Sequence, residues 1–285
     1  MNIPPTPFDH TQIREELKLI RQKARAQKTP GNLKLAFSCI DLTTLNPTDT
    51  ITRATGFTQK VNEFAKAYPE VPNVAAICIY PNLVSTARET LAAPDVKIAS
   101  VAGGFPSSMT FAELKTEEAR LAVANGAEEI DIVLPLWAFL DGNLHYCFDE
   151  IAAVKKAIGK AHLKVILESG VLGDTEKIWQ ASFLSLEAGA DFIKTSTGKL
   201  PQAATPEAAY TMCRAIKWWY NKTGEKRGFK PAGGISTPDE ALLYISIVKE
   251  VLGNEWLNNR LFRIGASRLA NNLLSGIYKK EITHF

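Results

Sequence analysis

The stretch that runs from HLKVILES (162–169) through ADFIKTS (190–196) to GFKPAGG (228–234) decides the fold class. Each segment alternates apolar with other residues, which is the pattern of a strand whose two faces meet different surroundings. Helical patterns separate the segments, near 175–188 and 206–221. Strands that alternate with helices in this way favour a parallel sheet with crossover helices.

The same unit recurs along the whole chain. Short runs rich in small, apolar and β-branched residues lie near 34–40, 74–79, 97–102, 129–134, 163–168, 191–195, 228–232 and 261–265. Helical patterns follow them near 50–66, 83–92, 111–124, 148–158, 175–188, 206–221, 238–252 and 267–278. Eight such units predict an α/β fold, a (β/α)8 TIM barrel. The alternative, a doubly wound open sheet, would need a phosphate-binding glycine turn after its first strand, and FSCIDLTTLN (37–46) has none.

No linker or change of composition divides the chain after its first thirty residues, so residues 31–285 are expected to form a single barrel catalytic domain. Residues 1–30 are expected to form a helical extension. Asp9 and Gln12 have the spacing of a capping box, and a charged helical run with a narrow apolar stripe follows through Arg25. This pattern favours a helix packed on the closed end of the barrel or at a subunit contact over a regulatory arm.

Composition excludes several classes of partner. The 285 residues are 46% apolar and 22% charged, as in an ordinary globular protein, and the net charge of +3 is too small and too dispersed for nucleic acid. No apolar stretch could span a membrane, and MNIPPTPFDH (1–10) has no signal-peptide core. The four cysteines form no C-x-x-C pair and no zinc-like spacing with histidine, which predicts reduced thiols in a cytoplasmic protein without a metal site.

Charged residues occupy the strand face opposite the apolar, helix-facing one. In the barrel that face points inward, and it carries Asp41, Asp131, Lys164, Lys194 and Lys230, together with Cys78. One buried charge on a strand would indicate an ion pair. Five charges on converging strands indicate a functional site, because clustered charges in a low-dielectric interior shift one another's pKa values.

A pair of lysines on neighbouring strands favours covalent chemistry. Only the neutral amine is a nucleophile, and an unperturbed lysine has a pKa of ~10.4. Burial and a second ammonium group both lower that pKa. Lys194 and Lys230 are expected on adjacent strands, ~4.8 Å apart, so one can be covalent while the other stays charged. A carboxylate such as Asp131 could then move protons.

Glycine-rich turns follow the later strands. Phosphate in such barrels commonly lies between the loops after strands seven and eight, where backbone N–H groups and a helix N-terminus face it. The predicted phosphate-binding residues in these loops, and in the loop after strand six, are Gly198, Lys199, Gly233, Gly234, Gly265 and Ser267.

These residues also carry a family resemblance. The chain resembles the deoxyribose-phosphate aldolases from about Leu35 to Leu274, in the segments DLTTLN (41–46), AAICIYP (75–81), GAEEIDIVLP (126–135), LKVILESG (163–170), GADFIKTSTGK (189–199), GFKPAGGI (228–235) and RIGASRL (263–269). The resemblance implies a class I aldolase on a (β/α)8 barrel, with no metal and no organic cofactor. Its small phosphorylated sugar substrate would be 2-deoxy-D-ribose 5-phosphate, interconverted with acetaldehyde and D-glyceraldehyde 3-phosphate.

The resemblance also implies roles for individual residues. Lys194 would form the Schiff base, Lys230 would lower its pKa, and Asp131 would donate and accept protons. The residues expected to line the site and position substrate or water are Asp41, Cys78 and Lys164.

Some features depart from the family or lie outside the match. Arg268 stands where the family often has a second serine, so it either contacts phosphate or points to solvent. The tail KKEITHF (279–285) either stays disordered or folds over the barrel mouth. A homodimer is expected, because it is the commonest oligomer of soluble proteins.

Two rival functions stay open. One is another phosphate-sugar barrel enzyme, such as an isomerase or a transaldolase-like enzyme. An isomerase would need a carboxylate base and an electrophile rather than a lysine pair. The other rival is a barrel that binds a phosphosugar without turning it over; loss of Lys194 or Asp131 would have favoured it, and both are present.

Overall fold

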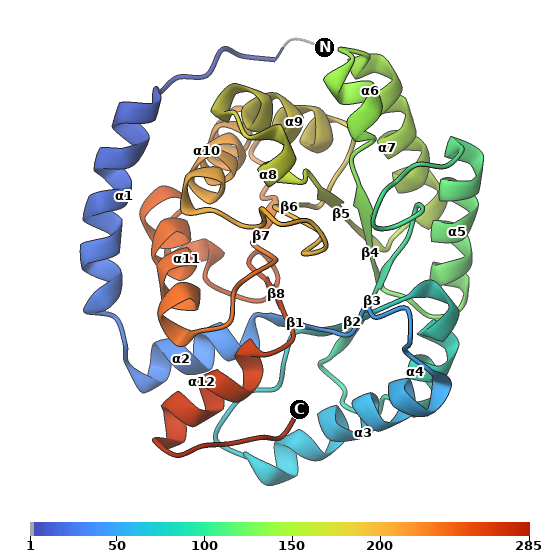
Figure 1. Ribbon diagram of the computed structural model, residues 1–285, viewed down its shortest axis with the longest axis vertical. Coiled ribbons are helices and arrows are strands. Elements are labelled where there is room, and N and C mark those ends of the chain that lie inside the picture. Colours follow the sequence, from blue (N-terminus) through green and yellow to red (C-terminus); the bar gives the residue numbers. More distant parts are fainter. Residues whose placement is uncertain (1–2) are drawn as a thin grey trace.

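Eight parallel strands form the centre of the computed structural model, which describes residues 3–285 (Figure 1). The strands are β1 (Ile40–Thr43), β2 (Ala76–Ile79), β3 (Lys97–Val101), β4 (Glu129–Val133), β5 (His162–Ile166), β6 (Phe192–Lys194), β7 (Gly228–Lys230) and β8 (Ile264–Ala266). They pair in the order β7-β6-β5-β4-β3-β2-β1-β8, and bridges from Phe229 to Phe262 and from Ala232 to Gly265 join the two ends. The predicted TIM barrel is therefore confirmed, and the open sheet is excluded.

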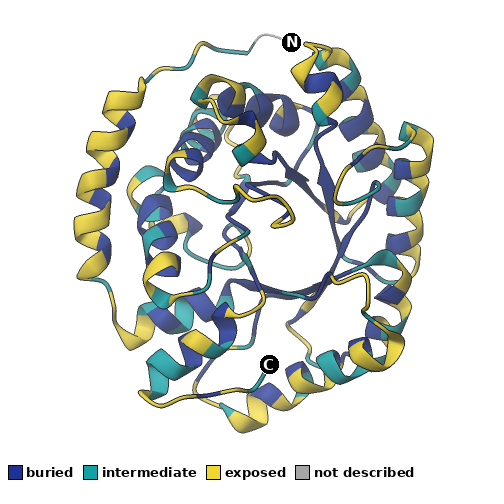
Figure 2. Ribbon diagram, viewed as in Figure 1, coloured by how far each residue is buried: buried dark blue, intermediate teal, exposed yellow. Residues whose placement is uncertain are grey.

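Helices surround the strands and cover their apolar outer faces (Figure 2). They are α3 (Ile51–Ala67), α4 (Val84–Thr90), α5 (Ala112–Ala124), α6 (Leu136–Leu140), α7 (Leu144–Ile158), α8 (Ser169–Leu172), α9 (Thr175–Glu187), α10 (Pro206–Thr223), α11 (Pro238–Val251) and α12 (Leu269–Tyr278), with 3-10 turns η1 (Pro81–Leu83) and η2 (Asn254–Trp256). Local sequence starts several of them. Thr205 and Thr237 cap α10 and α11, each followed by a proline whose fixed φ suits the first helical position.

The prediction of a first strand at 34–40 was wrong. Residues Pro30–Ser38 form helix α2, and the strand begins at Ile40. Thr29 caps this helix by accepting a hydrogen bond from the N–H of Asn32, and Pro30 occupies its first turn. The apolar residues follow helical spacing, since Leu33, Ala36 and Phe37 are all buried. Asp41 nevertheless lies on the inner face of β1, as predicted.

The N-terminal helix α1 (His10–Arg25) has the predicted capping box, in which Asp9 and Gln12 satisfy each other's backbone N–H groups. Its position differs from the prediction. The helix packs outside the ring, against α11 and α10, rather than on the closed end of the barrel (Figure 1). Its buried stripe, Ile13, Leu17, Ile20 and Ala24, fits there because the outer surfaces of α10 and α11 supply the apolar contact that it needs.

The C-terminal tail does not stay free, and it ends beside the barrel mouth, where Phe285 lines a pocket with Thr43, Asn46 and Ser267. Asn271 on α12 binds the tail: its amide nitrogen donates to the carbonyl of Phe285, and its oxygen accepts from the N–H groups of His284 and Phe285. The Phe285 ring stacks on Phe64 of α3, with 5.7 Å between ring centroids. Among residues 3–285, no helix is both long and apolar enough to cross a membrane.

Candidate active site

The interior of the barrel has an apolar half and a charged half. Strands β2 and β3 place small or apolar side chains on the inner face, and the loops after β1, β2 and β3 add larger ones at the mouth. This wall consists of Leu45, Ala76, Cys78, Ala99 and Val101, with Tyr80 and Phe105 packed against it. Strands β4 to β7, Asp41 of β1 and Arg263 just before β8 supply the charged side chains.

Asp131 is the centre of the charged half. Its Oδ2 lies 2.8 Å from the Nζ of Lys194 and 2.8 Å from the Nζ of Lys230, and its Oδ1 lies 2.9 Å from the Nζ of Lys164. Lys230 also lies 2.5 Å from Oδ2 of Asp41. All five predicted charges therefore meet in one network. The strand register explains this, because Asp131 pairs with Lys164 across β4 and β5, and Lys194 pairs with Lys230 across β6 and β7.

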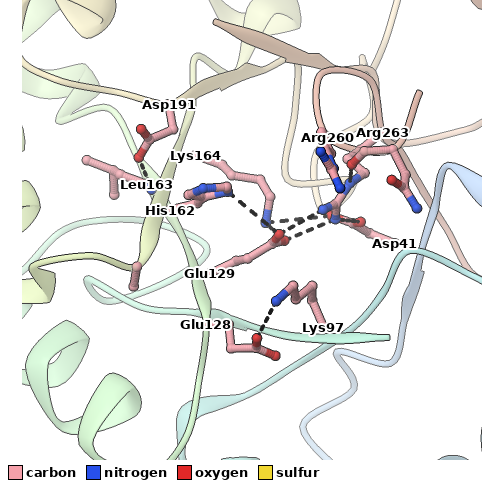
Figure 3. A network of polar contacts seen from close by, with 12 residues as sticks. Asp41, Lys97, Glu128, Glu129, His162, Leu163, Lys164, Asp191, Arg260 and Arg263 are labelled. Atoms are coloured by element: carbon pink, nitrogen blue, oxygen red, sulfur yellow. Dashed lines mark hydrogen bonds and ion pairs between the residues drawn. The ribbon is translucent and has the colours of Figure 1, made fainter. Parts of the chain in front are cut away.

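Two further charges belong to this network and were missed in the sequence. Arg263 joins Asp41 to Glu129, with N–O distances of 2.6 Å to Asp41 and 2.7 Å to Glu129 (Figure 3). Glu129 also lies 2.6 Å from the Nζ of Lys164. The alternation rule could have found Glu129, which precedes Asp131 by two residues on the same strand. Arg263 precedes β8, outside any strand, so only the fold reveals it.

The network separates the protonation states of its lysines. Burial, aided by the ammonium group of Lys230, lowers the pKa of Lys194 against the pull of Asp131. Burial also acts to lower the pKa of Lys230, but Asp131 and Asp41 outweigh it and raise that pKa. The three ammonium groups hold the pKa of Asp131 well below its usual value, although burial opposes them. Lys194 is therefore the lysine most readily neutral, and Lys230 stays charged.

Cys78 lies on the inner face of β2, within the apolar wall and 1% exposed. Burial raises the pKa of its thiol, and the carboxylate of Asp131 adds to that effect. The thiol is therefore protonated and behaves as a small apolar side chain.

A pocket of about 290 Å³ opens above the network at the carboxyl ends of the strands. Lys194 lines it, whereas Asp131, Lys230, Lys164 and Asp41 lie buried beneath. All six predicted phosphate residues, Gly198, Lys199, Gly233, Gly234, Gly265 and Ser267, line its rim. Helix α12 begins at Leu269 with no side-chain cap, so its first N–H groups are free to bind an anion there.

Glycine is required at two positions of this rim by close contacts. Gly233 has φ +90°, and a Cβ there would lie 2.6 Å from the Cβ of Ala203. A Cβ on Gly265 would lie 2.8 Å from the Cβ of Ala232 and 3.2 Å from Cε of Lys230. These glycines let the loops after β6, β7 and β8 approach one another closely enough to present their N–H groups together.

Arg268 lines the rim of the pocket and is also exposed to solvent. The pocket also contains residues that the sequence did not indicate. Thr43, Asn46 and Ser236 line it as well. Lys199 reaches across the mouth, where its Nζ donates to the carbonyl of Leu45 at 2.5 Å. No local signal marks Thr43 or Ser236, because neither is charged and neither belongs to a glycine pair.

Glu168 supports the rim from below. Its carboxylate accepts hydrogen bonds from the hydroxyl and the backbone N–H of Thr197, at 2.6 and 3.3 Å. Its backbone is left-handed, with φ +51°. Burial raises the pKa of this carboxyl group. Glu168 thus anchors the loop that carries Gly198 and Lys199.

Comparisons with known proteins agree with this geometry. The family model of the DeoC/LacD family aldolases matches residues 35–251. A deoxyribose-phosphate aldolase from Mus musculus is 44% identical over 268 residues, covering 90% of this chain and 84% of that protein. One from Homo sapiens is 44% identical over 253 residues, covering 85% and 80%.

A solved structure gives the same result. The tetrameric deoxyribose phosphate aldolase from Aeropyrum pernix superimposes with a TM-score of 0.68 and 25% identity, covering 92% of this chain and 98% of that one. The resemblance stated from the sequence is thereby confirmed. The family match covers most of the chain, and a relative that is 44% identical covers 90% of it, so this chain belongs to the DeoC/LacD family of aldolases.

Proposed function

We propose that this aldolase reversibly cleaves 2-deoxy-D-ribose 5-phosphate into acetaldehyde and D-glyceraldehyde 3-phosphate through a Schiff base on Lys194. One observation carries the proposal: Lys194 lines the pocket at the carboxyl ends of the strands, and its Nζ lies 2.8 Å from the buried carboxylate of Asp131. The mammalian relatives named above are deoxyribose-phosphate aldolases, which supports the same substrate.

The chemistry follows from the protonation states. The lone pair of neutral Lys194 attacks the C1 aldehyde, and loss of water gives a protonated imine. The C2–C3 bond then breaks toward the imine while a base removes the proton of the C3 hydroxyl, which leaves C3 as the aldehyde of D-glyceraldehyde 3-phosphate. The remaining enamine takes a proton at C2, and water releases acetaldehyde. In the proposal, Asp131 moves these protons and Lys230 keeps Lys194 neutral.

The remaining predicted residues have supporting roles in the proposal. Asp41 and Lys164 orient Asp131 and Lys230 through their ion pairs. Cys78 belongs to the apolar wall opposite the charges. The rim glycines, Lys199 and Ser267 hold the phosphate in the same pocket that Lys194 lines.

The direct test joins turnover with trapping. The protein is expected to release acetaldehyde and D-glyceraldehyde 3-phosphate in equal amounts from 2-deoxy-D-ribose 5-phosphate. With acetaldehyde and a borohydride reductant, peptide mass spectrometry should find one added ethyl group, on Lys194. Turnover without a trapped lysine, or label spread over surface lysines of the folded protein, would contradict the mechanism.

The phosphate site gives a separate prediction. Ser267→Glu should raise the KM for 2-deoxy-D-ribose 5-phosphate about 10- to 100-fold, because a carboxylate at the start of α12 competes with and repels the phosphate. Cleavage of unphosphorylated 2-deoxy-D-ribose should change little. Ser267→Ala is the matched control and should have a much smaller effect. Equal losses on both sugars would show that Ser267 does not act through phosphate.

We further infer a cytoplasmic homodimer whose catalytic unit is residues 31–285, with residues 1–30 as an extension that packs on it. Four buried, unpaired cysteines among the described residues support a reducing compartment. Exposed apolar side chains of Met109, Phe111, Leu114 and Leu121 support a subunit contact around α5. Light scattering after size-exclusion chromatography measures the oligomer directly, and a monomer or a tetramer would correct this proposal.

A further inference from the structure

Arg263 and Glu129 form a layer of charge beneath the residues that face the pocket. Neither lines the pocket, and their side chains are only 5% and 2% exposed. Figure 3 shows Glu129 and Lys164 pointing toward Arg263 and Asp41 inside the barrel. The guanidinium group of Arg263 makes two contacts with Glu129 and one with Asp41, and it stacks over the ring of Phe192 at 5.8 Å. Burying these charges costs desolvation free energy, so their presence in the interior calls for a physical explanation.

The charge count of the interior supplies that explanation. The network holds three carboxylates, Asp41, Glu129 and Asp131, and three cations besides Lys194, namely Lys164, Lys230 and Arg263. These six charges balance only if Lys194 is neutral. A protonated Lys194 would add a fourth cation in a place that water barely reaches.

We propose that Arg263 and Glu129 are positioning residues that set the protonation state of Lys194 by fixing the charge balance of the barrel interior. The proposal rests on the proposed role of Lys194 as the Schiff-base lysine. Neither residue touches the reacting atoms; each acts through the groups between it and Lys194.

Two unbroken routes of contact connect the layer with Lys194. From Arg263 the first route runs to Asp41 at 2.6 Å, to Lys230 at 2.5 Å, and to Asp131 at 2.8 Å. From Glu129 the second runs to Lys164 at 2.6 Å and to Asp131 at 2.9 Å. Asp131 lies 2.8 Å from Lys194 and ends both routes. In a low-dielectric interior, removing a charge at one end of a route changes the electrostatic interactions of the groups along it, and so their pKa values.

The other groups around Lys194 do not set the balance. Strand β2 presents the protonated thiol of Cys78, and β3 presents only Ala99 and Val101. Glu168, at the end of β5, is held by hydrogen bonds from Thr197, and it is the same in every variant of the test below, so it cannot cause opposite shifts between them. The network contains the charges that contacts connect with Lys194.

The test uses opposite changes of charge. The rate of reductive trapping of acetaldehyde on Lys194 with cyanoborohydride, followed by mass spectrometry across pH, reports the fraction of neutral amine. The acid limb is the part of the pH–rate profile where Lys194 becomes protonated and trapping slows. Arg263→Met removes a cation, so the acid limb should move to higher pH. Glu129→Gln removes a carboxylate, so the limb should move to lower pH. Each shift should be on the order of one pH unit. The double variant restores the balance and should return the limb toward its original position.

Controls separate this effect from damage to the fold. Arg263→Lys keeps the charge but loses the two-pronged contact with Glu129, so it should lower the trapping rate without moving the limb. Circular dichroism checks each variant. If Arg263→Met does not fold, Glu129→Gln compared with the double variant still tests the sign.

The outcomes distinguish the two proposals. Label on Lys194 with limbs that stay fixed, or that move in the same direction in both single variants, would overturn the charge-balance role and leave the Schiff base intact. Absence of label on Lys194 in the unmodified protein, at every pH, would overturn the proposed function and with it this inference.

Discussion

Replacing Lys194 with alanine is expected to lower kcat/KM for 2-deoxy-D-ribose 5-phosphate by at least about 10⁴-fold, since the covalent route has no substitute once its nucleophile is lost. Borohydride trapping with acetaldehyde should disappear as well. The fold should persist, because the change removes a neutral side chain and leaves the same three carboxylates and three cations in the interior. Steady-state assays and intact-protein mass spectrometry measure both effects.

Lys199 offers a matched control for this variant. It lies at the same pocket but reaches the carbonyl of Leu45 rather than Asp131. Lys199→Met should raise KM for the phosphorylated sugar while Lys194 remains labelled by acetaldehyde. A Lys194→Ala variant that kept more than about a hundredth of the activity would be incompatible with a Schiff base on this residue.

Asp131→Asn should affect both turnover and stability. An amide cannot carry protons between the substrate and the lysines, so kcat should fall by about 10²- to 10⁴-fold. The same change leaves Lys164 and Lys230 with fewer counter-charges in a dry interior, and breaking a buried pair costs roughly 3–5 kcal/mol. Pre-steady-state trapping should show slower formation of the imine, and urea unfolding should show the loss of stability.

Asp239→Asn is the control for stability. This aspartate pairs with Lys28 at 2.9 Å, but its side chain is 74% exposed. Its removal should change the free energy of unfolding by no more than about 1 kcal/mol. Full activity in Asp131→Asn would assign the proton transfers to another group, and unchanged stability would mean that water reaches the network.

The sequence predicted the inward position of the lysines correctly because alternation along a strand is a local property. Lys164, Lys194 and Lys230 each follow an apolar residue, and period two places each lysine on the face opposite that residue. The turns were equally local. Gly233 follows β7, Gly265 lies in the short strand β8, and both line the pocket. Whether these residues have the proposed roles still depends on the experiments above.

Where the prediction failed, two local patterns competed. The run 34–40 is short and apolar, and such a run fits a buried strand or a helix equally well. Thr29, which caps the helix, and Pro30, in its first turn, favour the helix. The extension shows the other kind of failure. Its apolar stripe predicted that α1 packs on something, but the partner, α10 and α11, lies about two hundred residues further along the chain.

By itself, then, the sequence determined the barrel, the inward face of the strands that carry the predicted site residues, and the lysines on it, because repeat order and strand alternation are properties of short segments. Only the tertiary structure decided which charges touch. Arg263 meets Asp41 across 222 residues of sequence, at a contact that exists only once β8 pairs with β1. The charge balance around Lys194 is the sum of charges that come from five strands and a turn. No short segment of sequence contains all of these charges, so no local pattern predicts the balance. Closure of the barrel therefore fixes what strand alternation cannot: the distances between charges, and so their pKa values.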